Sequence, residues 1–491
     1  MTTHAQRTPP PGKTSTEAAA RRQAAVVIEA GIAKFPAGRL EDQARAAAEA
    51  AYARRPEDRV YRIPAGTPLE EVNALELAPG ATVLFERGGT WRGQLQVASG
   101  IPGRPIRYGA FGDGAPPAIQ PSMDGGDPDS WREEASGVWA FDTGSPIDVG
   151  NAILDDGASG CLFKRGARAD LLHDRDFFFD PGSGRVFVRS DGGNPARRWR
   201  SVELAQKLNG VDQPCAHDVE YSGLCVRYAA AHGFGGGGTA RIVLRDCSVL
   251  WIGGGYLYRD DLGNGVRYGN GIELWGGAQD VLVERCRASE CWDAGITNQT
   301  NEPGSVQRNV VWRNCEVSRC EYSYEFWHQG EGGTAENVRL ENNRFSGAGL
   351  GWGHAQRWNP NAAHLMLYDT VMHTPGFVVS GNVFSRSENV LMRVFNDWKG
   401  EAAFEGNVWE SAGEPLARCH RRPRLGLRHF YPDRLDRIHD DNALEIESQG
   451  PGGTLYGASA DSFGRLCADF AFGAGNVLKT VQGDFSGIRA Q

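Results

Sequence analysis

The sequence predicts an all-β protein built as a parallel β-solenoid, in which successive coils of the chain stack on one another. One observation is a repeated phrase, a β-rich run followed by polar residues, in VLRDCSV, LVERCRA, VWRNCEV, RLENNRF, VVSGNVF and FEGNVW. Another is its spacing, because the equivalent position recurs every 23 to 39 residues without helical periodicity. A coil buries its inner face only against its neighbours, which produces such a repeat. The alternative is an ordinary β-sandwich with unrelated Asn and Cys residues.

One position of the repeat is expected to stack as a column inside the coils. It is occupied, in chain order, by Leu224, Cys247, Cys286, Cys315, Asn343, Asn382 and Asn407. Small polar side chains stacked in this way can hydrogen-bond from coil to coil. Three of the ten cysteines fall on this column, so we expect most of them to be reduced packing residues. The sequence has no C-x-x-C pair, so neither a structural zinc site nor another metal site is expected.

Composition argues against several classes of protein. The net charge of -9 argues against a nucleic-acid partner, because phosphate binding needs a basic face. No apolar run approaches 18 residues, so no membrane span is expected. The first residues, MTTHAQRTPPPGKTSTEAAARRQ, have no apolar stretch after their basic residues, so no signal peptide is visible. Localisation stays open between a cytoplasmic protein and one secreted by another route or with a missing leader, and so does the oligomeric state.

The chain divides into five segments. Residues 1–56 are rich in Ala, Glu and Arg and are expected to form a helical cap over the open end of the solenoid. Residues 57–122 form the first coils, 123–200 an inserted antiparallel β subdomain, 201–450 the main solenoid and 451–491 a C-terminal cap. Within the insertion, FFFDPGSGRVFVRS has the pattern of a β-hairpin around a Pro-Gly turn.

The second strand of each coil carries the side chains that can do chemistry. Aligning HGFGGGG, NGIELWG, AGITNQT, YSYEFWH, HLMLYDT and LMRVFND places alternate residues such as Ile272 and Leu274 inside. Their neighbours are then expected to face solvent in two columns. The first column is Gly235, Glu273, Thr297, Glu325, Met366 and Arg393, and the second is Gly237, Trp275, Gln299, Trp327, Tyr368 and Phe395.

This face is suited to bind sugars. Large aromatics are normally buried, so a stack of them beside carboxylates on an exposed sheet is unusual for a structural surface. Aromatic rings pack on the C–H faces of a pyranose, while carboxylates, amides and Arg take its hydroxyls. We therefore nominate Trp275, Gln299, Trp327, Tyr368 and Arg393 as substrate-binding residues. The alternative is that a neighbouring loop or subunit simply covers these aromatics.

Two long insertions are expected to flank the face. They are residues 253–268 and 347–364, and each leaves the coil ahead of its second strand. Because they leave at the same corner, they should stand as two walls, and long loops on a rigid scaffold are where function tends to lie. The second wall adds His354 as a candidate acid or base, and Gln356 and Arg357 as substrate-binding residues.

Four carboxylates are candidate catalytic residues. Glu273 and Glu325 lie two rungs apart, roughly 9.6 Å at the backbone, near the carboxyl separation of inverting glycosidases. Asp293 and Glu321 fall on neighbouring rungs, at roughly 5 Å, the separation of retaining enzymes. The spacing nominates four residues and does not select a pair. Each one has the alternative reading of a surface carboxylate, and Asp293 that of a turn residue.

Several motifs together carry a resemblance to a known family. They are the opening PGATVLFERGGTWRGQL, the insertion from GDP to FFFDPGSGRVFV, the corners NNRFS, GNVFS and RNCEVS, and the runs YGNGIELWGG, WDAGITNQ, EYSYEFW and GWGHAQR. Over about residues 60 to 450 the chain resembles the right-handed parallel β-helix proteins of the pectate-lyase-like superfamily, chiefly its bacterial carbohydrate-active members. The resemblance implies that fold, on which glycoside hydrolases, polysaccharide lyases, epimerases, esterases and phage tailspikes are all built.

Departures from the family's patterns favour hydrolysis. The Asn-Thr-Asp, Asp-Asp and Gly-His-Gly pattern of polygalacturonases is not matched, and neither is the Asp-rich calcium cluster of pectate lyases. We therefore expect a glycoside hydrolase that acts on a polysaccharide or oligosaccharide through Asp and Glu side chains, without a cofactor. One alternative is a polysaccharide lyase, in which Arg357, Arg393 or a bound calcium ion would neutralise a uronate. The other is a non-catalytic sugar-binding solenoid or tailspike.

Overall fold

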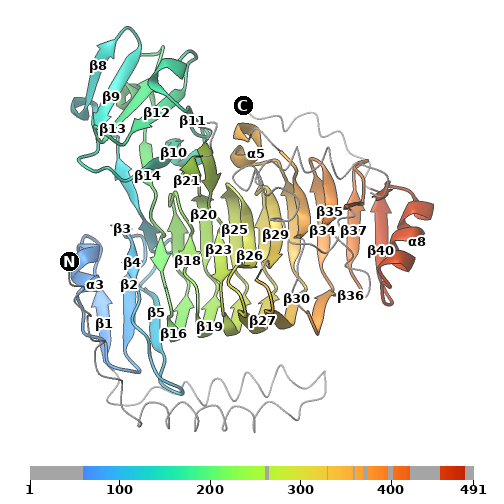
Figure 1. Ribbon diagram of the computed structural model, residues 1–491. Helices are drawn as coiled ribbons and strands as arrows, with labels where there is room; N and C mark the ends of the chain where they lie inside the picture. The colour runs from blue at the N-terminus through green and yellow to red at the C-terminus, as the bar shows by residue number, and fades with distance from the viewer. Residues whose placement is uncertain are drawn as a thin grey trace, which may run out of the picture.

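The molecule is a stack of coils whose strands form three long sheets. The computed structural model describes residues 59–259, 265–328, 330–357, 360–368, 374–395, 402–420 and 454–480. Three sheets of ten strands, here called sheets A, B and C, run along the molecule (Figure 1). Successive strands of a coil enter sheets A, B and C in turn, and they pair in parallel with the strands of the neighbouring coil. The exception is the edge strand Thr454–Tyr456 of sheet C, which pairs antiparallel. The predicted all-β solenoid is confirmed.

The strand bounds follow the repeat. Sheet A comprises β1 (Val60–Ile63), β2 (Thr82–Glu86), β5 (Ile106–Phe111), β16 (His217–Ser222), β19 (Ala240–Arg245), β24 (Gln279–Glu284), β27 (Val306–Arg313), β30 (Thr334–Glu341), β33 (Phe377–Ser380) and β36 (Ala402–Glu405). Sheet B comprises β3 (Thr90–Arg92), β6 (Ala118–Gln120), β17 (Cys225–Arg227), β20 (Ser248–Ile252), β25 (Arg287–Cys291), β28 (Glu316–Ser318), β31 (Arg344–Ala348), β34 (Val383–Ser387), β37 (Val408–Ser411) and β40 (Val477–Thr480). Sheet C comprises β4 (Leu95–Gln96), β15 (Val211–Asp212), β18 (Phe234–Gly235), β23 (Ile272–Trp275), β26 (Ala294–Thr300), β29 (Tyr322–His328), β32 (Ala363–Leu367), β35 (Val390–Phe395), β38 (Ala417–His420) and β39 (Thr454–Tyr456).

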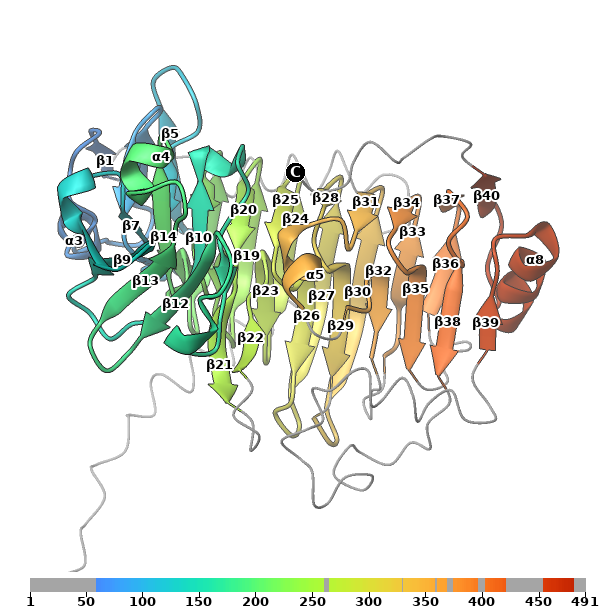
Figure 2. The ribbon, with the colours of Figure 1, turned by 90° about the horizontal axis from the view of Figure 1, so that it is seen from above.

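An antiparallel subdomain is inserted between β6 and β15, near the N-terminal end of the solenoid (Figure 2). Its base is a three-stranded sheet of β7 (Ser122–Asp124), β10 (Val149–Leu154) and β14 (Val202–Gln206). Its outer part is a five-stranded sheet of β8 (Trp131–Ala135), β9 (Val138–Asp142), β11 (Phe163–Lys164), β12 (Asp176–Asp180) and β13 (Arg185–Arg189). The hairpin predicted from FFFDPGSGRVFVRS is the antiparallel pair β12 and β13. The insertion leaves the sheets intact, because β5 pairs directly with β16 and β6 with β17.

Short helices and one hairpin decorate the coils. The helices are α3 (Leu69–Asn73), α4 (Pro195–Arg198), α5 (Trp352–Gln356) and α8 (Ala460–Asp469). Residues Leu466 and Phe470 pack α8 and its C-cap into the core, which closes the C-terminal end of the solenoid. The hairpin is β21 (Gly255–Arg259) with β22 (Gly265–Tyr268). No helix in the described ranges is long and apolar enough to cross a membrane. The predicted helical cap at 1–56 lies outside the described residues.

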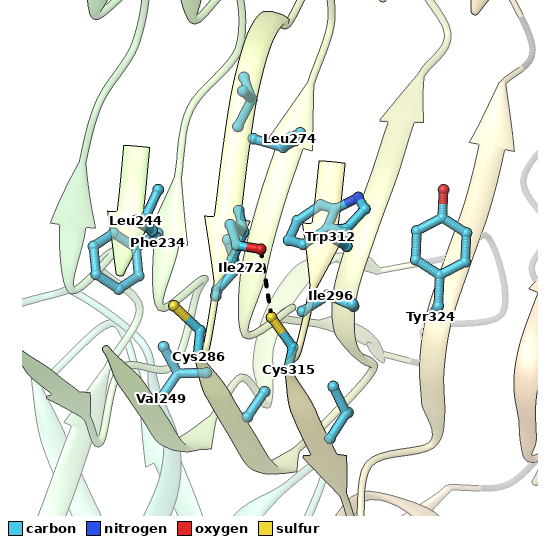
Figure 3. Packing of buried hydrophobic residues seen from close by; sticks show 14 of the residues in the cluster. Phe234, Leu244, Val249, Ile272, Leu274, Cys286, Ile296, Trp312, Cys315 and Tyr324 are labelled. Atoms are coloured by element: carbon cyan, nitrogen blue, oxygen red, sulfur yellow. Dashed lines mark hydrogen bonds between the residues drawn. The ribbon is translucent and has the colours of Figure 1, made fainter. Parts of the chain in front are cut away.

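The column predicted from the repeat lies inside the coils. Its seven members are each at most 2% exposed. Figure 3 shows Cys286 and Cys315 beside Ile272, Ile296 and Trp312 of the apolar core. Each thiol of the column donates mainly to the carbonyl oxygen two residues earlier, in the last residue of the preceding sheet A strand, at 3.3 to 3.5 Å. The predicted role of these cysteines as buried packing residues is confirmed.

The asparagine half of the column is a continuous hydrogen-bonded ladder. The Oδ1 atom of Asn382 accepts both the backbone N–H and the side-chain amide of Asn343, each at 2.9 Å. The Oδ1 atom of Asn407 accepts the same two groups of Asn382 at 3.0 Å. Each side-chain amide also donates to a main-chain carbonyl, as from Asn382 to Leu340 at 2.9 Å. Asn476 adds one further step beyond Asn407, which the repeat in the sequence did not predict.

Candidate active site

The two predicted columns of sheet C exist in the predicted register. Glu273 pairs with Thr297 and Thr297 with Glu325, so the two glutamates lie two rungs apart. The same column continues through Met366 to Arg393. The second column is paired likewise, from Gly237 through Trp275 and Gln299 to Trp327. None of these residues belongs to the solenoid core, which takes the alternate positions such as Ile272, Leu274, Tyr324 and Phe326.

The first column is, however, not exposed to solvent as expected. Glu273 is 6% exposed, Glu325 5%, Arg393 3%, and Met366 not at all. The reason is that large side chains close over this face. Met366 packs in a small apolar cluster of its own outside the core, with Ala294, Tyr322 and Phe395, and partly buried Tyr368 against it. The face is therefore covered by side chains. A substrate would have to enter at its edge, where the second column is partly exposed.

The aromatic residues of the second column form two ring pairs. The rings of Trp275 and Trp327, both partly exposed, have centroids 5.9 Å apart and are tilted by 33°. Their backbones lie two rungs apart, about 9.6 Å, so the side chains lean toward each other across Gln299. The indole N–H of Trp275 donates to Glu302 at 3.3 Å. Further along, Tyr368 and Phe395 stack at 5.0 Å with nearly parallel planes.

Glu273 is a buried carboxyl with a histidine beside it. The Nε2 atom of His232 lies 3.2 Å from Glu273 Oε2. Because Nδ1 of His232 accepts the backbone N–H of Asn270 at 3.1 Å, the neutral ring carries its proton on Nε2 and donates it toward Glu273. Burial lowers the pKa of His232 to about 3, so the ring is neutral. Burial raises the pKa of Glu273 to about 8; the Asn270 hydrogen bond opposes this rise and the charge of Asp293 adds to it.

Asp293 has the opposite environment, because it is paired with an arginine. An Nη2 donor of Arg357 lies 2.8 Å from Asp293 Oδ1 and also donates to the carbonyl oxygen of Trp292 at 2.7 Å. The Asp293 side chain is 22% exposed, more than Glu273 or Glu321. Burial opposes the charge of Arg357, but Asp293 and Glu321 raise its pKa above the ordinary value. Arg357 is thus a permanent cation that holds Asp293 as a carboxylate.

Glu321 is fixed by several donors and is fully buried. The Nδ1 atom of His354 lies 2.9 Å from Glu321 Oε2, and the backbone N–H of Asn361 donates to Oε1 at 2.8 Å. Arg357 Nε lies 3.8 Å from the same carboxylate. Burial would raise the pKa of Glu321, but Arg357, His354 and the Asn361 amide outweigh it, and the pKa is lowered. Glu321 is therefore an anion that orients Arg357 and His354.

Glu325 joins the other carboxylates through a chain of amides. The side-chain amide of Gln299 donates to Glu325 Oε2, and Gln299 Oε1 accepts from the side-chain amide of Asn270 at 3.3 Å. The Asn270 side chain in turn accepts the backbone N–H of Ala294 at 3.0 Å, next to Asp293. The amide chain thus runs from the neighbourhood of Glu273 to Glu325.

The two predicted walls are in contact and form one wall. Arg267 of β22 donates to Gln356 Oε1 at 3.0 Å, and its guanidinium lies 3.8 Å over the ring of Trp292. The amide group of Gln356 donates to Leu162 O at 2.9 Å, in the inserted subdomain. The structure therefore places Gln356 at the junction of α5 with the insertion. His354 and Arg357, from the same helix and its C-cap, point the other way, onto Glu321 and Asp293.

The site thus unites some predicted residues and separates others. Asp293, Glu273, Glu321, His354 and Arg357 form one network. Tyr368 and Arg393 lie on later rungs of the sheet. In the described part of the chain no group of three or more His, Cys, Asp or Glu side chains is arranged to hold a metal ion.

Two residues of the network were missed from the sequence. His232 is the first residue of the aligned segment HGFGGGG, and Asn270 is the first residue of NGIELWG, two residues before β23. The sequence could have indicated both residues, because each lies just before a strand of sheet C, next to the position that Asp293 has in its own coil. Only the pairing of the strands brings them onto Glu273.

Comparisons with known proteins bear on the fold. Residues 217–384 match the family model of the right handed beta helix region. A search of curated proteins gave no match. Similar solved structures include XylC in complex with xylose, 11% identical over 74% of this chain and 71% of that chain, with a TM-score of 0.44. A lacto-N-biosidase from Eubacterium ramulus is 15% identical over 75% of this chain and 66% of that chain, with a TM-score of 0.33.

An alginate lyase from a Paenibacillus species is 12% identical over 72% of this chain and 87% of that chain, with a TM-score of 0.37. Likenesses at this level carry no argument about substrate or mechanism. The strand pairing and the family model nevertheless agree on the architecture. The described residues have the fold of a right-handed parallel β-helix.

Proposed function

We propose that the protein is a carbohydrate-active enzyme, and specifically a glycoside hydrolase in which Glu273 and Asp293 act as a pair. The observation that supports this is the contrast between the two carboxyl groups. They lie close enough for the charge of Asp293 to raise the pKa of Glu273, yet only Asp293 has a cation beside it. Neighbouring carboxyl groups held in different protonation states are the arrangement that glycosidic bond cleavage requires.

Glu273 is the proposed general acid. With a pKa of about 8 it keeps its proton at neutral pH and can donate it to the glycosidic oxygen as the bond breaks. His232 supports this role without supplying charge, because its ring is neutral and its Nε2–H holds one carboxyl oxygen. The other oxygen is the one that would face the leaving group.

Asp293 is the proposed base or nucleophile. As a carboxylate held by Arg357, it either takes a proton from the attacking water or attacks the anomeric carbon itself. The net reaction in both cases adds one water across the glycosidic bond. Glu321 and His354 position Arg357 and need not touch the substrate.

Trp275 and Trp327 are the proposed sugar platform. Both rings are partly exposed on the second column, and each lies two residues after a buried carboxylate on the same strand. Ring faces of this kind pack against the apolar face of a sugar, which would orient a chain across the open edge of the site. The stacked Tyr368 and Phe395 extend the same column by two further rungs.

The decisive test is a panel of polysaccharides and oligosaccharides with product masses read by mass spectrometry. Products that gain one water support hydrolysis. Products that lack this water and absorb in the near ultraviolet would instead identify the lyase alternative. Binding without any product would identify a non-catalytic sugar-binding solenoid.

The residue assignment is tested on the active substrate with Glu273→Gln and Asp293→Asn. Both variants should lose activity and keep the thermal unfolding temperature of the parent protein. Glu316→Gln is the matched control, since Glu316 is an exposed carboxylate on sheet B that pairs with Arg287. Full activity in both site variants would exclude the pair.

A further inference from the structure

A second site is suggested by a pocket on sheet B, whereas the carboxylate network lies on sheet C. The pocket has a volume of about 500 Å³ and opens on sheet B, where β3, β6 and β17 meet the base of the insertion and the segment that leads into α3. Its polar lining comes from Thr67, Glu70, Thr90, Arg92, Gln120, Glu203 and Arg227. Volumes of about 300 to 1,000 Å³ are typical of small-molecule sites.

Arg227 is the residue of this pocket that indicates a binding site for a ligand. Its Nε donates to Gln120 Oε1 at 2.7 Å, and its guanidinium lies 4.9 Å from the ring centroid of Tyr228. Gln120 is 1% exposed and is itself held near Ser122, so the guanidinium is anchored from a buried side chain. Among the carboxylates that the structure describes, none forms an ion pair with Arg227. Its terminal amino groups therefore present an oriented and unneutralised positive charge.

Arg92, on the same pocket, provides the contrast. Both of its terminal nitrogens bind the carboxylate of Glu203, at 2.7 and 2.9 Å, and Ser122 also donates to that carboxylate at 2.7 Å. This pair, to which Asp124 adds a second carboxylate 3.4 Å from an Arg92 terminal nitrogen, leaves no positive charge of Arg92 unmatched. It offers hydrogen-bond donors and acceptors to a neutral polar ligand. Arg227, by contrast, has a positive charge that can pair with an anion.

We propose that this pocket binds a sugar that carries a carboxylate, a uronic acid unit. A guanidinium pairs with a carboxylate through two parallel hydrogen bonds, and Arg227 has the two terminal groups available for this. The hydroxyls of such a sugar match the Arg92 and Glu203 pair and the side chains of Thr67 and Thr90. The inference stands apart from the proposed hydrolase site, because it rests on sheet B and on binding alone.

The proposal is tested by isothermal titration of the full chain with glucuronate, galacturonate, glucose, galactose, acetate and inorganic phosphate. Uronates should bind with a Kd of about 1 mM or tighter, and at least tenfold tighter than the neutral sugars or acetate. Arg227→Gln should weaken uronate binding at least tenfold. Arg287→Gln is the control, since Arg287 lies on the outer face of the same sheet and already pairs with Glu316.

Further variants separate this pocket from the candidate active site. Gln120→Leu should also weaken binding at an unchanged unfolding temperature, because it releases the Arg227 side chain. Trp275→Ala should leave uronate binding unchanged. Equal binding of neutral sugars, tighter binding of phosphate or acetate, no effect of Arg227→Gln, or no binding at all would each overturn the proposal. Loss of uronate binding in Trp275→Ala would do the same, since the ligand would then sit on sheet C.

Discussion

The asparagine ladder and the carboxylate network occupy overlapping coils of one solenoid and are built in opposite ways. In the ladder each coil repeats the last, so that Asn382 does for Asn343 what Asn407 does for Asn382. In the network each coil contributes something different, from His232 in one coil to Glu273 in the next and Asp293 in the one after. Repetition satisfies every polar group and stabilises the coil. Departure from repetition leaves groups such as Glu273 in costly environments that chemistry can use.

The largest effect is expected from Glu273→Gln. Loss of a general acid should lower kcat/KM by about a thousandfold, equivalent to about 4 kcal/mol of transition-state stabilisation. Stability should not fall, because the amide removes a carboxyl that is costly to ionise in this buried position. Steady-state kinetics and thermal unfolding check both halves of the statement. A variant that loses stability in step with its activity would place Glu273 among the structural residues instead.

Asn382→Ala should show the reverse pattern and the next largest effect. It removes the acceptor of two hydrogen bonds from Asn343 and the donor to Leu340, which leaves buried groups without partners. The free energy of unfolding should fall by about 3 kcal/mol. The folded fraction should keep full kcat/KM. Denaturant titration measures the free energy of unfolding. A loss below about 1 kcal/mol would mean that the ladder contributes little to stability.

Activity should fall as pH rises through the pKa of Glu273. With a pKa of about 8, the acid is mostly ionised at pH 9, and the rate should drop by about tenfold. Because the folded-state pKa lies above the ordinary value of 4.5, the unfolded chain releases this proton first, so the stability due to Glu273 also declines between pH 4.5 and 8. A kcat profile in the parent that stays flat through pH 9 would contradict this role.

The smallest effect is expected from Cys286→Ala. The Cys286 thiol donates to the carbonyl oxygen of Glu284, two residues earlier, so its loss mainly removes packing within the core. The free energy of unfolding should fall by about 1 kcal/mol, clearly less than for Asn382→Ala. Chemical denaturation of the two variants side by side measures the difference between the two halves of the column. Equal losses would show that packing, and not hydrogen bonding, stabilises both.

The repetitive part of this molecule could be predicted from its sequence, and the irregular part only in outline. The register of Glu273, Thr297 and Glu325 follows from the alternation of side chains along aligned strands, and the structure has that register. The covering of this face could not be predicted, because it depends on how Tyr322, Phe395 and their neighbours fold over it. The contact of Arg267 with Gln356 likewise joins segments 89 residues apart, and no local sequence pattern predicts it.

The inserted subdomain shapes the order in which the coils can assemble. Neighbouring strands of sheet A are 23 residues apart at Asp218 and Arg241, but 113 residues apart at Arg107 and Glu220, on either side of the insertion. Closing the longer loop costs about 1.4 kcal/mol more in chain entropy. We therefore expect the coils after the insertion to fold first. The first two coils would then pack onto these folded coils last.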